Sequence, residues 1–142
     1  MKDCIVGCAT NYDWSKLKYW VNSINASGFE GDKVLILMNC DKDTVQKVTD
    51  AGFSVIAFNK DAQGNLTYNS QLMVHVERFI HIYRLLKDNQ YRYVITTDVR
   101  DVIFQKNPVD WIVVCIYFTN NISYTSSRSS ICFCRRKINI FN

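Results

Sequence analysis

Features that mark several common protein classes are missing from this chain of 142 residues. No apolar run approaches the roughly 20 residues that a membrane-spanning helix requires, so we expect no transmembrane segment. The apolar stretch near the N-terminus is too short for the core of a secretory signal. The net charge of +4 is modest, and part of the basic excess lies in the tail rather than on a basic stripe, so we expect no nucleic-acid partner.

Two further patterns are absent. Gly7 stands alone after an apolar run, without the glycine spacing of a dinucleotide-binding turn or a phosphate-binding loop. The six cysteines are scattered, and several lie inside strand-like runs, which is not the spacing of a secreted disulfide framework. We therefore expect reduced thiols and a cytoplasmic location.

Continuous apolar runs alternate with amphipathic segments along the chain. Strands are expected at 4–10, 33–39, 53–59 and 91–97. Helices are expected after the cap Asp13, at about 43–51, and from the cap Ser70 to about residue 89. This alternation is typical of an α/β fold with a mainly parallel, Rossmann-like sheet and helices on both faces. Because crossovers are right-handed, we predict that the first strand lies beside the fourth.

The composition changes at about Trp111. From there to Asn142 the chain contains no Gly, Pro, Ala, Leu, Asp or Glu, and no regular helical or strand period. We predict a domain at 1–112 and an atypical tail at 113–142, mobile from about Thr119. The tail is either a frame-shifted or truncated end or a disordered natural segment.

Polar side chains follow the first predicted strand. Thr10, Asn11 and Tyr12 offer a hydroxyl, an amide and a ring to a ligand, and ligands bind at the carboxyl ends of strands in open α/β sheets. A base or a ribose suits this set. Asn11 is explained equally well by ordinary turn chemistry.

The fourth predicted strand ends in "TTDVRD". Asp98 and Asp101 flank Val99 and Arg100 in this motif. Two carboxylates on one tight turn suit a hard divalent cation whose oxygen shell is completed by substrate phosphates. The alternative is a structural corner in which Arg100 pairs with one acid while the other caps the next turn, and the spacing leaves both open.

The long predicted helix carries an arginine within its apolar arc. Its polar stripe consists of Glu77, His81, Arg84 and Asp88. Arg78 lies among apolar positions and needs an anion, because a buried guanidinium without a partner is very costly. That anion is Asp98, Asp101 or a ligand phosphate. We expect His75 and His81 to be ordinary core or surface histidines.

At this point the residues resemble a known family. "TDVRD" followed by "VIFQKNP", and preceded by "ERFIHIYRLLKDNQYRYV", resembles the nucleotide-sugar-dependent glycosyltransferases of GT-A fold that carry a D-x-R-D version of the D-x-D motif. "IVGCATNY" is similar to the family's first strand and its nucleotide-contacting loop. The resemblance covers roughly residues 3 to 112.

The resemblance implies a donor site and a metal. Asp98 and Asp101 would hold a divalent ion, manganese in most of the family, against the diphosphate of a nucleotide-sugar donor. Arg100 stands where the family has its second acid, so Asp101 either supplies the missing ligand or pairs with Arg100, and binding then needs no metal. The donor-binding residues would be Thr10, Asn11, Tyr12, Arg78 and Arg100.

The implied function is transfer of a sugar from this donor to an unknown acceptor, by displacement of a nucleoside diphosphate. Residues 1–112 would be the nucleotide-sugar-binding half of a GT-A-like domain. The family's acceptor half has no counterpart after about Trp111, so we expect weak donor binding and no transfer by this chain. No catalytic base or nucleophile is identifiable. The alternatives are a non-catalytic nucleotide- or phosphate-binding α/β module, and a phosphotransfer or hydrolase enzyme that uses the acid pair.

Overall fold

The computed structural model describes residues 2–58, 74–112 and 130–133. The strands are β1 (Lys2–Thr10), β2 (Asp32–Met38), β3 (Ser54–Phe58), β4 (Tyr91–Asp98) and β5 (Ser130–Phe133). They form one parallel sheet in the order β3-β2-β1-β4-β5. The prediction of a mainly parallel α/β sheet is confirmed, and so is the placing of the first strand beside the fourth.

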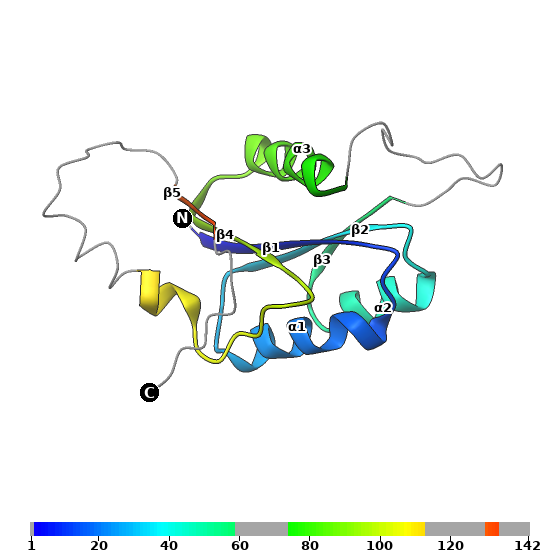
Figure 1. Cartoon of the computed structure of the whole chain (residues 1–142). Helices are drawn as coiled ribbons and strands as arrows, with labels where there is room; N and C mark the ends of the chain where they lie inside the picture. Colours follow the sequence, from blue (N-terminus) through cyan, green and yellow to red (C-terminus); the bar gives the residue numbers. More distant parts are fainter. Residues whose placement is uncertain (1, 59–73, 113–129, 134–142) are drawn as a thin grey trace, which may run out of the picture.

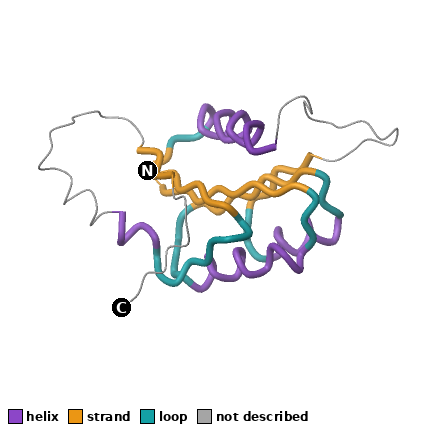
Figure 2. The backbone as a smooth tube through the Cα atoms, viewed as in Figure 1, coloured by secondary structure: helices purple, strands orange, loops and turns teal. Residues whose placement is uncertain are grey.

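Helices cover both faces of the sheet. Figure 1 shows α1 (Trp14–Ala26) and α2 (Lys42–Asp50) on one face and α3 (Val74–Asp88) on the other, and the tube in Figure 2 shows the same layers. The chain moves outward from β1 to β3 and then returns to the other side of β1 for β4. Right-handed crossovers in opposite directions place their helices on opposite faces. Within the described ranges, no helix is both long and apolar enough to cross a membrane.

Local side-chain chemistry sets where the first two helices begin. The side chains of Asp13 and Asp41 each accept a backbone N–H of the first helical turn, at 3.2 and 2.6 Å. The predicted cap Asp13 is therefore confirmed, whereas α2 begins at Lys42, one residue before the predicted start. The predicted cap of the third helix, Ser70, lies outside the described residues.

The larger core lies between the sheet and α1 with α2, and Trp20 is its centre. Trp20 is fully buried, its Nε1 donates to Thr97 Oγ1 at 2.9 Å, and its ring centroid lies 5.7 Å from that of Phe53. Gly7 of β1 lies beneath the indole. A Cβ at this position would be 2.9 Å from Trp20 Cη2 and 2.6 Å from Val99 Cγ1, so only glycine allows this close packing.

A smaller core lies under α3. Its buried members are Cys4, Val6, Val34, Ile36, Ile82, Tyr91 and Val94. Leu85 and Leu86 of α3 pack against this group. Cys8 near the carboxyl end of β1 and Phe58 at the end of β3 also pack against it, so the edge of this core reaches the carboxyl ends of these strands.

Half of the predicted polar stripe of α3 is buried, which corrects the prediction from the sequence. Glu77 and His81 are only 2% and 4% exposed, whereas Val76 and Tyr83 of the predicted apolar arc are 45% and 66% exposed. A helix turns as one rigid body. The rotation that packs Ile82 against the sheet therefore also carries Glu77 and His81 inward.

Part of the predicted tail forms a strand. β5 lies parallel to β4, with Ser130 opposite Tyr93 and Phe133 opposite Thr96. This strand corrects the prediction for residues 130–133, which was a mobile segment without a regular strand period. Residues 113–129 and 134–142 lie outside the described residues, so the predicted mobility of those segments stays a prediction.

Candidate functional site

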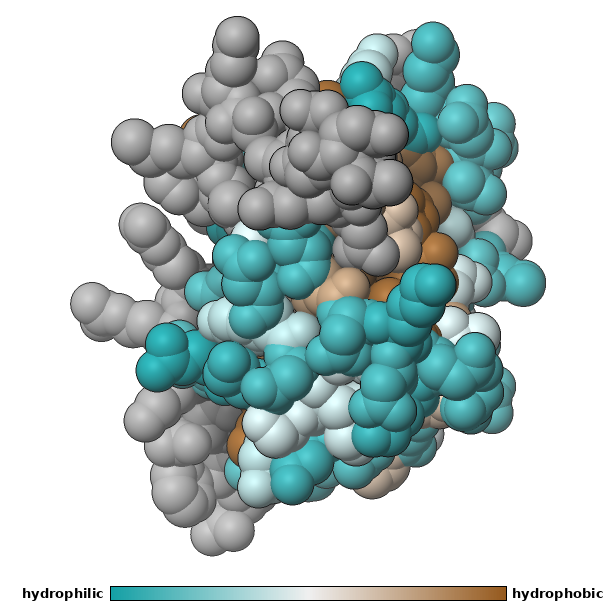
Figure 3. Space-filling view, turned by 90° about the vertical axis from the view of Figure 1, so that its right-hand side faces the viewer, coloured by the Kyte–Doolittle hydropathy of each residue, from teal (hydrophilic) through white to brown (hydrophobic). Residues whose placement is uncertain are grey.

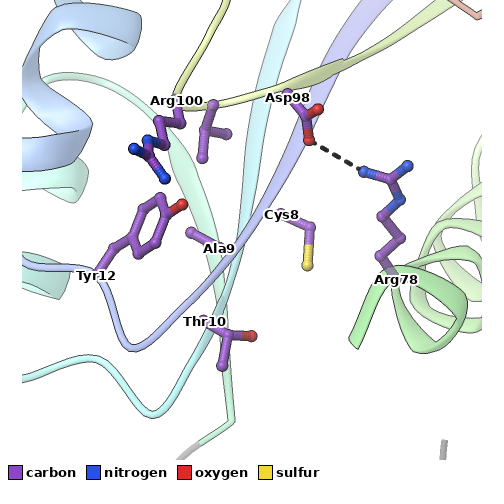
Figure 4. A pocket seen from close by; sticks show the side chains of 8 residues that line it. Cys8, Ala9, Thr10, Tyr12, Arg78, Asp98 and Arg100 are labelled. Atoms are coloured by element: carbon purple, nitrogen blue, oxygen red, sulfur yellow. Dashed lines mark hydrogen bonds and ion pairs between the residues drawn. The ribbon is translucent and has the colours of Figure 1, made fainter. Parts of the chain in front are cut away.

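A cavity of about 270 Å³ lies at the carboxyl ends of β1 and β4. The order of strands along the sheet reverses direction between these two strands, and ligands of open α/β sheets bind at such switch points. The described residues that line the cavity are Cys8, Ala9, Thr10, Tyr12, Arg78, Asp98, Val99 and Arg100 (Figure 4). The structure therefore brings together five of the seven residues predicted from the sequence as site residues.

One part of the lining faces α3. Cys8 and Thr10 are two residues apart on β1, so their side chains point to the same face of the sheet. Asp98 pairs with Cys8 across β1 and β4 and shares that face. Arg78 reaches this group from α3, as Figure 4 shows.

Arg78 and Asp98 form an ion pair in the cavity. Their Nη1 and Oδ1 atoms are 3.4 Å apart, which confirms the prediction that Arg78 lies within reach of one of the two acids. Both side chains are partly open to solvent, and such exposed pairs contribute about 0–1 kcal/mol. A contact this long leaves much of the hydrogen-bonding capacity of the guanidinium unused.

Two buried polar atoms of the same lining have no hydrogen-bond partner among the described residues. They are Thr10 Oγ1 and Arg78 Nε. More than nine in ten buried polar groups in proteins are hydrogen-bonded, so two exceptions in one cavity are unusual. Both groups can donate a hydrogen bond, and the threonine hydroxyl can also accept one.

The thiol of Cys8 adds no charge to the cavity. Burial raises the pKa of Cys8 to about 12, and the positive charge of Arg78 only partly opposes this effect. The thiol is therefore neutral near physiological pH. Among the described residues of the lining, the remaining charged groups are two arginines and one aspartate, which together carry one net positive charge.

The other part of the lining faces α1. Tyr12 packs at the edge of the larger core, and Lys16 Nζ lies 5.5 Å from the centroid of its ring. Arg100 follows β4 and is exposed beside Tyr12 in Figure 4. An aromatic ring next to a guanidinium offers one surface for stacking and another for an anion.

Asn11 and Asp101 do not belong to the described lining of the cavity. Asn11 has φ 56° at the end of β1, and its backbone N–H donates to Met38 O at 3.0 Å. Asparagine is one of the few residues that adopt this left-handed conformation readily, so the structure shows the turn role for Asn11. Asp101 is exposed, and within residues 2–58, 74–112 and 130–133 it forms no ion pair with Arg100.

The described residues do not match a manganese ion held by the predicted acid pair. Of that pair only Asp98 lines the cavity, and Arg78 already lies beside its carboxylate. No group of three or more His, Cys, Asp or Glu that could hold a metal occurs in the described ranges. Asp98 would be the one protein carboxylate in the lining, with the remaining oxygen ligands left to phosphates and water.

A buried polar pair continues from the cavity beneath α3, and the sequence does not predict it. Glu77 Oε1 and His81 Nε2 are 3.7 Å apart, and the imidazole stacks on Phe58 with 4.2 Å between ring centroids. Burial lowers the pKa of His81, and the carboxylate of Glu77 opposes this shift. Four-residue spacing of Glu and His is also typical of a solvent-facing stripe, so the spacing alone does not reveal the pair.

Figure 3 shows the end of the molecule at which the strands finish, where a patch of apolar residues lies beside hydrophilic ones. No protein-family model matches this chain, and no curated protein or solved structure is significantly similar to it.

Proposed function

We propose that this chain binds the diphosphate part of a nucleotide-sugar donor in the cavity between β1 and β4, as the donor-binding part of a GT-A-type glycosyltransferase. The supporting observation is that Thr10, Tyr12, Arg78 and Arg100 converge from separate segments at the switch point of the sheet. Guanidinium groups recognise phosphate oxygens through paired hydrogen bonds. The ring of Tyr12 offers a stacking surface to the base or the sugar.

The charges of the cavity suit the leaving group of sugar transfer. When the bond between the anomeric carbon and the diphosphate oxygen breaks, negative charge develops on the diphosphate. Arg78 and Arg100 would stabilise that charge from preorganised positions. No catalytic base or nucleophile is assigned.

The size of the cavity limits the proposal to the diphosphate part of the donor. Ligand pockets usually measure about 300–1,000 Å³, and this cavity measures about 270 Å³. Transfer also needs an acceptor held in near-attack geometry. The acceptor is unknown, and its site is not part of the proposal.

The manganese ion predicted from the resemblance, with Asp98 and Asp101 as its ligands, stays a prediction. The predicted cytoplasmic location also becomes a proposal. Its support is that Cys4 and Cys8 are free thiols in the structure, as expected for a reducing compartment.

A second candidate function is a non-catalytic phosphate- or nucleotide-binding module. The small cavity favours it, because the cavity suits one phosphate-sized group better than a complete donor. The two functions differ in whether the sugar of the ligand contributes to binding.

Thermal unfolding with a panel of ligands tests the proposal. Nucleotide sugars, the matching nucleoside diphosphates and simple phosphate esters are compared, each with and without Mn²⁺. A ligand at a hundred times its Kd stabilises the folded state by about 2.7 kcal/mol. We expect the largest rise in Tm from a nucleotide sugar, and equal shifts from a nucleotide sugar and its nucleoside diphosphate would favour the binding module instead.

Variants of the cavity connect this binding to the site. Arg78→Met and Arg100→Met should each reduce the shift in Tm, whereas Arg84→Met on the exposed side of α3 should leave it unchanged. Metal-dependent binding that is unaffected by Asp98→Ala and by Asp101→Ala would show that the predicted metal ligands are wrong.

A further inference from the structure

The two unpaired polar atoms of the cavity have chemistry in common. Arg78 Nε is a hydrogen-bond donor without acceptor capacity, and Thr10 Oγ1 is a hydroxyl that can donate. Both are buried, and both belong to residues that line the same cavity on its α3 side. Leaving such groups unpaired costs free energy, so an arrangement of this kind suggests a ligand that supplies the missing acceptors.

We infer that Thr10 and Arg78 form an oxyanion subsite that binds a phosphate group directly, without a metal ion. The inference rests on the proposed function in that the phosphate would be one of the two in the donor's diphosphate. Thr10 and Arg78 would contact this phosphate directly, and no cation would mediate the contacts.

The chemistry of the donors favours an anion over a cation. An N–H group is satisfied only by an acceptor, so a metal ion in the cavity would leave Arg78 Nε unpaired. A tetrahedral oxyanion can accept from Nε with one oxygen and from the Thr10 hydroxyl with another. The neutral thiol of Cys8 does not repel it, and the lining retains one net positive charge after Asp98 is counted.

The positive charge of Arg78 also takes the place of a bound cation beside Asp98. Its Nη1 lies 3.4 Å from Asp98 Oδ1 and offsets the charge of that carboxylate. The same guanidinium presents Nε on another edge of its planar fork. Asp98 thus pairs with Arg78 in this arrangement and is not a ligand of the phosphate.

Binding of inorganic pyrophosphate and inorganic phosphate to the full chain in excess EDTA tests the subsite, with titration calorimetry as the readout. We expect heat of binding without any divalent ion. Thr10→Val keeps the branched shape but removes the hydroxyl, and Arg78→Lys keeps the charge but removes Nε. Each should weaken binding about tenfold or more, because each removes a hydrogen bond to a charged ligand.

Matched controls separate the subsite from general effects of charge and shape. Arg84→Lys changes an exposed arginine of the same helix, and Thr49→Val changes an exposed threonine of α2; neither should alter binding. Thr10→Val should also raise the Tm of the protein without ligand, because it removes a buried hydroxyl that has no partner. A merely structural hydroxyl would lower Tm on removal, and this outcome would overturn the inference.

Asp98→Asn distinguishes direct binding from metal-held binding. The side chain is exposed, so the variant should fold. Direct binding predicts that pyrophosphate affinity in EDTA is kept or increased, since a negative charge is removed. Binding that requires Mn²⁺ and disappears in Asp98→Asn would overturn the subsite but leave the proposed donor function standing. Metal-free pyrophosphate binding without any preference for nucleotide sugars would support the subsite but contradict the proposed donor function.

Discussion

On the face of the sheet that α1 and α2 cover, Ser23 and Thr97 are buried with hydrogen-bond partners, whereas several buried polar atoms of α3 have none among the described residues. Ser23 donates to Trp20 O at 2.8 Å, and Thr97 accepts from the indole of Trp20 at 2.9 Å. Under α3, atoms of Glu77, Arg78 and His81 are buried without a hydrogen-bond partner among the described residues. The unsatisfied atoms of Glu77, Arg78 and His81 therefore all belong to the helix on the second face.

The two faces of the sheet therefore differ in role: one contributes most of the core, and the other carries the cavity. The α1 face holds the larger apolar cluster, which includes the fully buried Trp20. The α3 face holds the smaller apolar cluster and presents the cavity at the carboxyl ends of β1 and β4. Sites of function are commonly where a protein tolerates unfavourable local energetics, which the rest of the fold offsets.

The largest expected effect is on the α1 face. Trp20→Ala should lower the free energy of unfolding by about 3–5 kcal/mol, because it opens a cavity in a close-packed core. It also removes the donor to Thr97. Urea denaturation measures the change, and Tyr19→Ala serves as control, since Tyr19 is 62% exposed on the same helix. Equal losses for the two variants would contradict the assignment of the core to this face.

Gly7→Ala should have an intermediate effect. The added methyl group would lie 2.6 Å from Val99 Cγ1 and 2.9 Å from the indole, so the packing must shift, at a cost of about 1–3 kcal/mol. Val99→Ala in the same protein should relieve part of this overlap. The double variant should therefore lose less stability than the sum of the two single variants, and simple additivity in urea denaturation would argue against the close approach.

The smallest expected effect lies on the α3 face and depends on pH. Burial holds the pKa of His81 below its ordinary value, so the unfolded chain takes up this proton first on acidification. The stability linked to His81 is therefore present above about pH 6.5 and is lost as the pH falls toward the pKa of the folded state. The charged groups that act on the imidazole are Glu77, which raises its pKa, and Arg84, which lowers it.

His81→Phe keeps a ring against Phe58 and removes the titrating group. Urea denaturation of both proteins between about pH 7 and pH 5 should show a smaller loss of stability in the variant. An unchanged difference between the two proteins across this range would mean that His81 keeps its ordinary pKa in the folded chain. The buried polar groups under α3 would then cost less stability than the comparison of the two faces suggests.

Much of the candidate site could be predicted from residue types at strand ends. Thr10 and Tyr12 follow one apolar run and Asp98 ends another, and carboxyl ends of neighbouring parallel strands meet at one edge of a sheet. Arg78 could be predicted because an arginine within an apolar arc needs an anion. The sequence could not show that Asp101 would stay outside the described lining, because one residue more or less in a turn changes where a side chain points.

The sequence alone specifies the order of the first four strands and the three helices, the N-terminal cap of α1 and the parallel arrangement with β1 beside β4. These features depend on apolar runs, local hydrogen bonds and the handedness of crossovers, which act over short stretches of chain. Only the tertiary structure decided the rotation of α3, and with it the burial of Glu77 and His81 and the position of Arg78 over Asp98. That rotation depends on all the contacts that the rigid helix makes with four strands, so no local sequence pattern predicts it.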